Sequence, residues 1–457
     1  MATDELKEAG GLLASAGDVK ADFKGLLKDH NFMKLFWAQL ISCLGDWMGT
    51  FALMSIVFRL THSPLAVGGM LAFRVVPALF SGPVAAVISD RLDRRKLMIS
   101  CDVARGCIIL IAPFLASLWS LYTMLFFLEG ISIIWLAARD ASIPNLVPPE
   151  RLTMANSISM ATTYGVIPFA ALFFSLFVFP SPLLRNLAAG SFLAKHPTVV
   201  AFALDSLSFF VSAGFFFRMS LSSPRDRRTE SEPLHIVSSI TFALRHPLAR
   251  SLLVGAAVGC IGGGSLYAVG IGYVKEVLHA RSDAAFGLLM ALFGLGMITG
   301  VVALQVLIKH EEKPWMLRIS LLVTGGILMG MAFVHIAVLA YTLAAFFGAA
   351  FGVLFVVAVQ MVQEGVDDDD RGKAFAAFHA VSRIFLIAGA GMAGGIAWGI
   401  GVRQVKVFGL SYTMYGASVA LFVAGILIAS VSVIPLGQKK ERYREYFARR
   451  PAEPVED

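Results

Sequence analysis

The sequence predicts an all-α integral membrane protein with twelve transmembrane helices in two six-helix bundles, a prediction based on three observations. The 457-residue chain is 57% hydrophobic and 15% charged, with a mean hydropathy of +0.75, whereas soluble proteins carry roughly 25% charged residues. Apolar stretches of about 20 residues, enough to cross a bilayer core, recur along the whole chain. One long polar connection divides these stretches into six and six.

Six apolar stretches precede the long connection. They are Lys34–Arg59, Pro64–Ile88, Leu97–Leu118, Leu121–Ala138, Met154–Phe179 and Thr198–Met219. Residues 1–33 mix acids and bases and lack the charged, apolar and small-residue order of a cleavable signal peptide. We therefore expect a cytoplasmic N-terminal segment over 1–33 and an N-terminal six-helix bundle over 34–219.

Six more stretches follow the connection. They are Ser251–Val274, Ala284–Ile308, Trp315–Val334, Ala337–Gln363, Ala374–Gly401 and Tyr412–Leu436. They predict a C-terminal six-helix bundle over 251–436 and a cytoplasmic tail over 437–457. The connection itself, residues 220–250, predicts a cytoplasmic linker, and the apolar spacing from Ile236 to Leu248 favours a short amphipathic helix on the membrane surface.

Lysine and arginine fall mainly in alternate connections, which predicts the orientation of the chain, because such residues are retained on the cytoplasmic side. The connections on the opposite side hold few cations: Arg185, Lys195, Lys275, Arg281, Arg403 and Lys406. We therefore expect a multi-pass protein of the cell membrane with both termini cytoplasmic. The net charge of +7 then indicates contact with anionic membrane lipid and not with nucleic acid.

The connection after the second stretch, "SDRLDRRKLM", is densely charged. A retention signal for the cytoplasmic side explains its arginines, but acids contribute little to orientation, so Asp90 and Asp93 need another explanation. An aspartate at a helix end can pair with nearby arginines or cap a neighbouring helix N-terminus.

Twelve stretches in two sixes, with D-R-x-x-R-R after the second, resemble the major facilitator superfamily. Its signature G-x-x-x-D-R-x-G-R-R is matched by Asp90, Arg91, Arg94 and Arg95, whereas Ala86 and Asp93 replace its two glycines. The resemblance implies that this turn is a conformational latch, holding the two halves together on the cytoplasmic side while the site faces out.

Three further stretches resemble the branch of enterobactin exporters and macrolide or tetracycline efflux proteins. They are "LGDWMGTFALMSIVFRLTHSPLAVGGMLAFRVVPAL", "SIPNLVPPERLTMANSI" and "ITFALRHPLARSLL". The fifth-span antiporter motif of the family, roughly G-P-x-x-G-G, is reduced here to Gly165 and Pro168 in "YGVIPFAAL". That departure weakens the case for drug–proton antiport and keeps a lipid translocator open.

An ionisable side chain within a span costs at least about 2.5 kcal/mol, so each one suggests a site. Asp46 and Arg74 lie at similar depths on neighbouring spans and predict a contact. Two interpretations stay open: a static ion pair that fixes helix packing, or a proton-coupling pair whose proton affinity changes as its members separate. In the second, a proton or a cationic substrate competes for Asp46.

Other charges in the spans have weaker cases. Glu129 and Asp205 are candidates to line the cavity, with hydrogen bonding to neighbouring helices as the alternative. Asp102 and Arg105 share one helix face and predict an intrahelical pair that supports the latch. One more candidate contact, which would support the association of the two halves, joins Arg383 and Glu364.

The sequence predicts no cofactor and no metal site. The four cysteines form no CxxC pair, and the aspartates of residues 367–370 favour a solvated loop, since calcium needs about six converging oxygens. The glycine-rich residues 388–399 lie within an apolar stretch, where small residues let helices pack closely.

The most economical hypothesis is a secondary transporter, monomeric by resemblance, in which two bundles alternate access to a central cavity. Its partners would be a small-molecule substrate and protons, with export of an amphipathic drug or siderophore as the leading interpretation. A lipid or lysophospholipid translocator is the alternative. A membrane-embedded enzyme or sensor subunit is a distant one, because the chain lacks HExxH, a Walker lysine and a Ser-His-Asp motif.

Overall fold

The computed structural model describes residues 25–148, 151–178, 198–220, 241, 247–307, 313–365, 368–407 and 410–433. These residues divide into two compact units. Unit 1 comprises Met1–Glu230 and Gly270–Gly294, and unit 2 comprises Ser231–Val269 and Leu295–Asp457. Residues 270–294 hold the end of the seventh predicted span and the start of the eighth. They therefore belong to unit 1, together with the first six spans.

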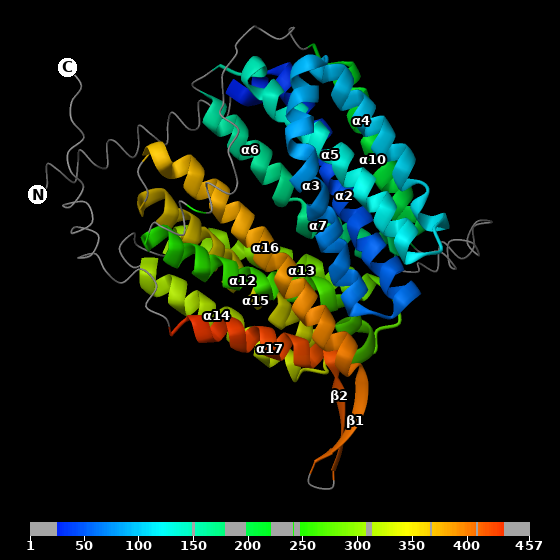
Figure 1. The fold of residues 1–457 in the computed structure, drawn as a ribbon, viewed down its shortest axis with the longest axis vertical. Helices are drawn as coiled ribbons and strands as arrows, with labels where there is room; N and C mark the ends of the chain where they lie inside the picture. Colours follow the sequence, from blue (N-terminus) through cyan, green and yellow to red (C-terminus); the bar gives the residue numbers. More distant parts are fainter. Residues whose placement is uncertain are drawn as a thin grey trace, which may run out of the picture. The chain divides into compact units, whose positions relative to one another are not determined.

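Unit 1 is a bundle built around the long helix α2 (Figure 1). Its elements in chain order are α2 His30–Thr61, α3 Pro64–Arg91, α4 Arg94–Ile109, the short 3-10 turn η1 Ala112–Phe114, α5 Leu118–Leu146, α6 Leu152–Tyr164, α7 Ile167–Val178 and α10 Val199–Phe217. Helix α2 packs on α10, α7 and α6, while α3 and α4 both pack on α5.

The second half of the chain is also built from helices. They are α12 Pro247–Gly272, the π-helical segment η3 Tyr273–Val277, α13 Ala284–Leu307, α14 Lys313–Ala332, α15 Ala337–Gly365, α16 Asp368–Ile400 and α17 Gly416–Val431. In unit 2, α14 packs against both α15 and α17, and α16 packs along α17.

The fold class follows the sequence closely, because each of the twelve predicted stretches overlaps a helix or a pair of consecutive helices. Among the described residues, 9 helices are long and apolar enough to cross a membrane. The protein is a mostly helical, multi-pass membrane protein.

Side-chain caps define where several helices of unit 1 begin. Asp29, Ser63, Asp93 and Ser117 each accept a hydrogen bond from a backbone N–H in the first turn of α2, α3, α4 and α5, because these N–H groups lack partners within the helix. Asp93, which replaces the second glycine of the family signature, therefore acts as an N-cap: its Oδ1 accepts from Lys96 N at 3.0 Å.

Unit 1 has two ends, the Asp90 end and the Arg59 end. The Asp90 end carries the turn between α3 and α4, at Leu92 and Asp93. The Arg59 end carries the turn between α2 and α3, where His62 adopts a left-handed φ of 49° and closes α2.

Several boundaries differ from the sequence-based expectation, and three of the differences are described here. The fifth span is interrupted between α6 and α7 at residues 165–166, next to Pro168, a residue that cannot donate a backbone hydrogen bond. The fourth continues past Ala138 to Leu146 with Pro144 inside the helix. The twelfth begins at Gly416 and not at Tyr412.

The residues before α17 form a β-hairpin, whose last four residues the apolar count assigned to the last span and whose other residues it left in a connection. Strand β1, Val402–Val407, pairs antiparallel with β2, Leu410–Tyr415, in a register running from Val402↔Tyr415 to Val407↔Leu410. Gly401, at φ 59°, ends α16 in the left-handed conformation that glycine adopts without strain. The hairpin extends from the end of α16 (Figure 1).

Close helix packing through small residues is confirmed at Gly389, Ala390 and Ala397 of the 388–399 stretch, whereas three of its glycines have no such contact among the described residues. A Cβ on Gly389 would lie 2.5 Å from the carbonyl oxygen of Ile261, so α12 and α16 meet backbone to backbone there. A Cβ on Gly391, Gly395 or Gly399 would meet no described atom within 4 Å. Of the amphipathic helix predicted over residues 236–248, all but residues 241, 247 and 248 lie outside the described residues.

Candidate functional site

The candidate site is an ion cluster inside unit 1 that joins three helices: α2, α3 and α5. Arg74 on α3 donates from one terminal nitrogen to Asp46 Oδ2 on α2 at 3.1 Å. Its Nε lies 2.5 Å from Glu129 Oε1 on α5. One guanidinium thus faces two carboxylates, and all three side chains are at most 22% exposed.

Thr50 and Trp47 hold this arginine in place. The second terminal nitrogen of Arg74 donates to Thr50 Oγ1 at 2.5 Å, and that hydroxyl donates to the backbone oxygen of Asp46 at 2.8 Å. The guanidinium carbon also lies 5.3 Å from the centre of the Trp47 ring, within the range of a cation–π interaction. Asp46, Trp47 and Thr50 lie within about one turn of α2, so a single helix segment supplies three of the arginine's contacts.

Asp205 on α10 lies beside the same turn of α2. Its side chain is buried, and its Oδ1 accepts no hydrogen bond in the part of the chain that the structure describes. A Cβ on Gly49 would lie 2.0 Å from Asp205 Oδ2, and one on Gly45 would lie 2.0 Å from Ser208 Oγ. The two glycines therefore form the notch that admits Asp205, one on each side of Asp46 in the sequence.

Carboxyl groups outnumber cations in this region. Asp46, Glu129 and Asp205 supply three carboxyl groups, and Arg74 is the cation that pairs with two of them. Arg105 on α4, another cation of unit 1, is paired with Asp102. An unpaired carboxylate in a low-dielectric interior is costly, so this cluster is suited to take up a proton or an organic cation.

The predicted pair of Asp102 and Arg105 is present on α4. Arg105 donates to Asp102 Oδ1, and Ser212 on α10 donates to Asp102 Oδ2 at 2.7 Å. The guanidinium of Arg105 lies 4.9 Å from the ring centre of Trp135 and 4.4 Å from that of Phe209. The pair therefore links α4, α5 and α10, and its support of the latch stays a prediction.

The arginines of the charged turn contact helix ends within unit 1. Arg94 donates to the backbone oxygen of Ala141 on α5 at 2.6 Å. Arg95 donates to the backbone oxygens of Phe216 and Phe217 at the last turn of α10. These bonds tie the first turn of α4 to α5 and to the last turn of α10, where the carbonyls carry partial negative charge, so the arginines brace the Asp90 end of the bundle.

The remaining latch and contact residues are only partly described. Arg91 is exposed, and Asp90 is the penultimate residue of α3, with its side chain outside the described residues. Arg383 on α16 is exposed, and the side chain of Glu364 lies outside the described residues. Within the described residues, no group of three or more histidine, cysteine or acidic side chains is placed to hold a metal ion.

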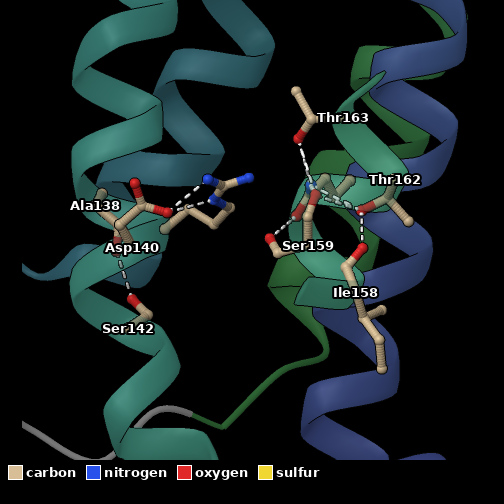
Figure 2. Close-up of polar contacts among 9 residues, drawn as sticks. Ala138, Asp140, Ser142, Ile158, Ser159, Thr162 and Thr163 are labelled. Carbon is tan, nitrogen blue, oxygen red and sulfur yellow. Dashed lines mark hydrogen bonds and ion pairs between the residues drawn. The ribbon is translucent and has the colours of Figure 1, made fainter. Parts of the chain in front are cut away.

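A polar network around Gln39 was missed in the sequence. Figure 2 shows the network: the amide nitrogen of this α2 residue donates to the Ser159 backbone oxygen at 2.7 Å and to the Thr162 and Thr163 hydroxyls at 2.9 Å each, all on α6. Ser159 Oγ donates to Gln39 Oε1 at 2.9 Å. A lone glutamine in an apolar stretch was the available signal, since a buried amide must find partners.

Arg139 is a second residue that sequence analysis missed, because it was assigned to a loop. The longer α5 places it inside the helix, where its side chain is 9% exposed and pairs with Asp140 Oδ1 at 2.5 Å (Figure 2). Its guanidinium also lies 5.8 Å from the Trp135 ring centre.

Comparison with known proteins identifies the family. The model of the Major Facilitator Superfamily matches residues 35–390. The chain belongs to the major facilitator superfamily. It is 27% identical over 441 residues to the uncharacterized MFS-type transporter YfiS of Bacillus subtilis (strain 168), covering 91% of this chain and 95% of that protein. It is 33% identical over 137 residues to macrolide efflux protein A of Streptococcus pyogenes, covering 27% of this chain and 33% of that protein.

The fold is likewise similar to a solved transporter. A bacterial homologue of the human lysosomal transporter Spinster, in its inward-facing and unoccupied conformation, superposes with a TM-score of 0.69 at 13% identity. The match covers 94% of this chain and 100% of that one. The superfamily member described here is therefore a multi-pass membrane transporter of small molecules, with relatives that include efflux proteins.

Proposed function

We propose that this transporter exports amphipathic small molecules, drugs or siderophores among them, by proton-coupled alternating access across the cell membrane. Both termini are cytoplasmic in this proposal, and the protein acts as a monomer. One observation carries it: Arg74 is shared by Asp46 and Glu129, so that one cation serves two carboxylates within the bundle.

This arrangement supports exchange between a proton and a substrate. When Arg74 contacts both acids, each carboxylate is only partly compensated. Protonation of one acid would leave Arg74 to the other, whereas binding of a cationic or hydrogen-bonding substrate would displace the proton. A rearrangement of α2, α3 and α5 that changes these distances would change proton affinity, which is the requirement for coupling a gradient to transport.

Asp205 provides a second proton-binding group in this proposal. Its buried Oδ1, which accepts no hydrogen bond from the described residues, favours a neutral carboxyl group. Because Asp205 sits in the notch of Gly45 and Gly49, its ionisation would also alter the contact between α10 and the turn of α2 that carries Asp46.

The test is transport in proteoliposomes with an imposed proton gradient. Ethidium, erythromycin and a lysophospholipid serve as probes of the cationic, macrolide and lipid classes. We expect gradient-driven transport of ethidium or erythromycin that Asp46→Asn and Glu129→Gln abolish, with protein yield and dispersity unchanged. Asp140→Asn is the matched control, because Asp140 belongs to an arginine–aspartate pair but is 56% exposed.

Two outcomes would contradict the proposal. Wild-type rates in both neutral variants would remove the coupling role of the cluster. Transport of the lysophospholipid alone, indifferent to an uncoupler, would replace drug export with lipid translocation.

A further inference from the structure

A second ion cluster lies at the Arg59 end of unit 1, and its central residue is Asp283. This carboxylate side chain is 4% exposed. Its Oδ1 lies 2.5 Å from Lys275 Nζ, and its Oδ2 lies 3.8 Å from Arg59 Nε. Arg59 in turn donates to Thr198 Oγ1 at 2.9 Å, at the start of α10.

These residues come from distant parts of the chain. Arg59 ends the first predicted span and Thr198 begins the sixth, whereas Lys275 and Asp283 flank the connection between the seventh and eighth. All of them belong to unit 1. We propose that Arg59, Lys275 and Asp283 form an ionic clamp that keeps the Arg59 end of the transporter closed by fastening the seventh and eighth spans to the first and sixth.

The local backbone positions Lys275 and Asp283 of the clamp. Lys275 lies in the π-helical segment η3, which is closed by the hydrogen bond from Leu278 N to Tyr273 O at 3.1 Å. Single π-turns within α-helices often mark functional sites. Asp283 precedes α13 and its carbonyl accepts from Phe286 N at 3.1 Å, so the helix dipole of α13 also favours the carboxylate.

An aromatic cluster lies near the clamp. One of its members, Phe286, follows Asp283 by three residues in the chain. Phe51 of α2, Phe174 of α7 and Phe286 of α13 are fully buried, and the Phe51 ring centre lies 6.1 Å from each of the other two. A Cβ on Gly287 would lie 2.7 Å from the Phe174 ring. The carboxylate of Asp283 thus lies one helical turn from a fully buried aromatic residue and is itself 4% exposed.

The burial of Asp283 explains why its pairing should favour closure. When the three residues separate, the carboxylate loses two cations and needs water to replace them. Water reaches that position only if the Arg59 end opens. Closed and open states therefore differ in how Asp283 is solvated, which makes the clamp a two-state element that a substrate or proton elsewhere can bias.

The inference rests on the alternating access of the proposed function, and its test needs neither substrate nor gradient. Ser55 is buried and lies one turn before Arg59 on the same face of α2. A Ser55→Cys reporter is made after replacing the four native cysteines, Cys43, Cys101, Cys107 and Cys260. A membrane-impermeant maleimide is then applied from the Arg59 side of oriented proteoliposomes.

We expect Asp283→Asn and Lys275→Gln each to raise the labelling rate of the reporter at least tenfold. Exchanging the pair, Lys275→Asp with Asp283→Lys, should bring the rate back toward that of the parent, which loss of structure alone would not do. Asp140→Asn, in an arginine–aspartate pair elsewhere in unit 1, is the control and should leave the rate unchanged.

Labelling within twofold of the parent in both single variants would overturn the clamp. If Asp283→Asn does not fold, Lys275→Gln decides, because Lys275 is 24% exposed and its loss leaves Arg59 to face the carboxylate. A failed clamp with intact effects of Asp46→Asn on transport leaves the proposed function standing. The reverse result leaves the clamp standing without proton coupling.

Discussion

Replacing Asp102 with asparagine should be the most destabilising conservative change among the charged residues of unit 1. Asp102 is fully buried, and it accepts from both Arg105 and Ser212. The substitution preserves volume but leaves Arg105, itself 5% exposed, as an uncompensated cation. Removing one partner of a buried ion pair costs about 3–5 kcal/mol. The rings of Trp135 and Phe209 beside the guanidinium retain part of its stabilisation, so we expect a loss of about 3 kcal/mol.

The assay is equilibrium unfolding of the purified protein in mild detergent, followed by tryptophan fluorescence. Asp140→Asn is the control for an ion pair that solvent screens, because Asp140 is 56% exposed. This substitution should lower the free energy of unfolding by about 0–1 kcal/mol. The double variant Asp102→Asn with Arg105→Gln should be less destabilised than the sum of the single variants, since it removes the orphaned cation. A loss below about 1 kcal/mol for Asp102→Asn would refute this reasoning about burial.

Two further predictions concern packing in unit 1. Gly49→Ala should lower the thermal unfolding temperature, because its Cβ would lie 2.0 Å from Asp205 Oδ2 and force α2 and α10 apart, whereas Gly130→Ala, which meets no described atom within 4 Å, should leave it unchanged. Gln39→Leu should cost about 1–3 kcal/mol in the same unfolding assay by leaving the Ser159 hydroxyl and carbonyl without this partner; an unchanged midpoint would show that water replaces the amide.

The sequence was sufficient for the fold because apolar length and charge placement are one-dimensional signals. A bilayer imposes a minimum span on each helix, so the twelve stretches could be located without knowing how the helices pack. The depth of a residue in the membrane could likewise be estimated from its distance in sequence to the end of its span. Comparing these distances for Asp46 and Arg74 predicted the contact between them. Glu129 was predicted to line the cavity and not to form an ion pair with Arg74, because the depth of a residue does not show which helices lie side by side.

Other features escaped because their signals depend on partners distant in sequence. Asp283 occupies a short connection and reads as an ordinary loop acid until Lys275 and Arg59 are placed around it. Gly45 and Gly49 flank Asp46 in "GDWMG", yet only the position of α10 shows that they admit Asp205. The hairpin at residues 402–415 was missed for a different reason: its first strand was left in a connection because of its charges, and the last four residues of its second strand were joined to the twelfth span because of their hydropathy, although the alternation of side chains suits a strand.

The distribution of buried charge gives the strongest argument for where the proposed proton coupling would take place. Among the described residues, the buried charged side chains are Asp102, Arg105, Arg139, Asp205 and Asp283, and all five belong to unit 1. Among the described residues of unit 2, the buried polar side chains are serines and a threonine. Each charge within a membrane domain costs several kcal/mol unless it is paired. Four of the five have an ion-pair partner within 4.0 Å: Asp102 with Arg105, Arg139 with Asp140, and Asp283 with Lys275 and Arg59.

Asp205 is the exception among these five residues. Within the described part of the chain it has no ion-pair partner within 4.0 Å, and its Oδ1 accepts no hydrogen bond there. Packing alone does not explain its retention, because an asparagine or a serine would fill the notch beside Gly49 without the cost of a carboxyl group. The proton coupling proposed above gives the carboxyl group a role, since a buried carboxyl group whose Oδ1 accepts no hydrogen bond from the described residues costs less when it is neutral than when it is charged. Asp205→Asn should therefore preserve the fold and abolish gradient-driven transport, whereas a serine that restored transport would assign Asp205 to packing.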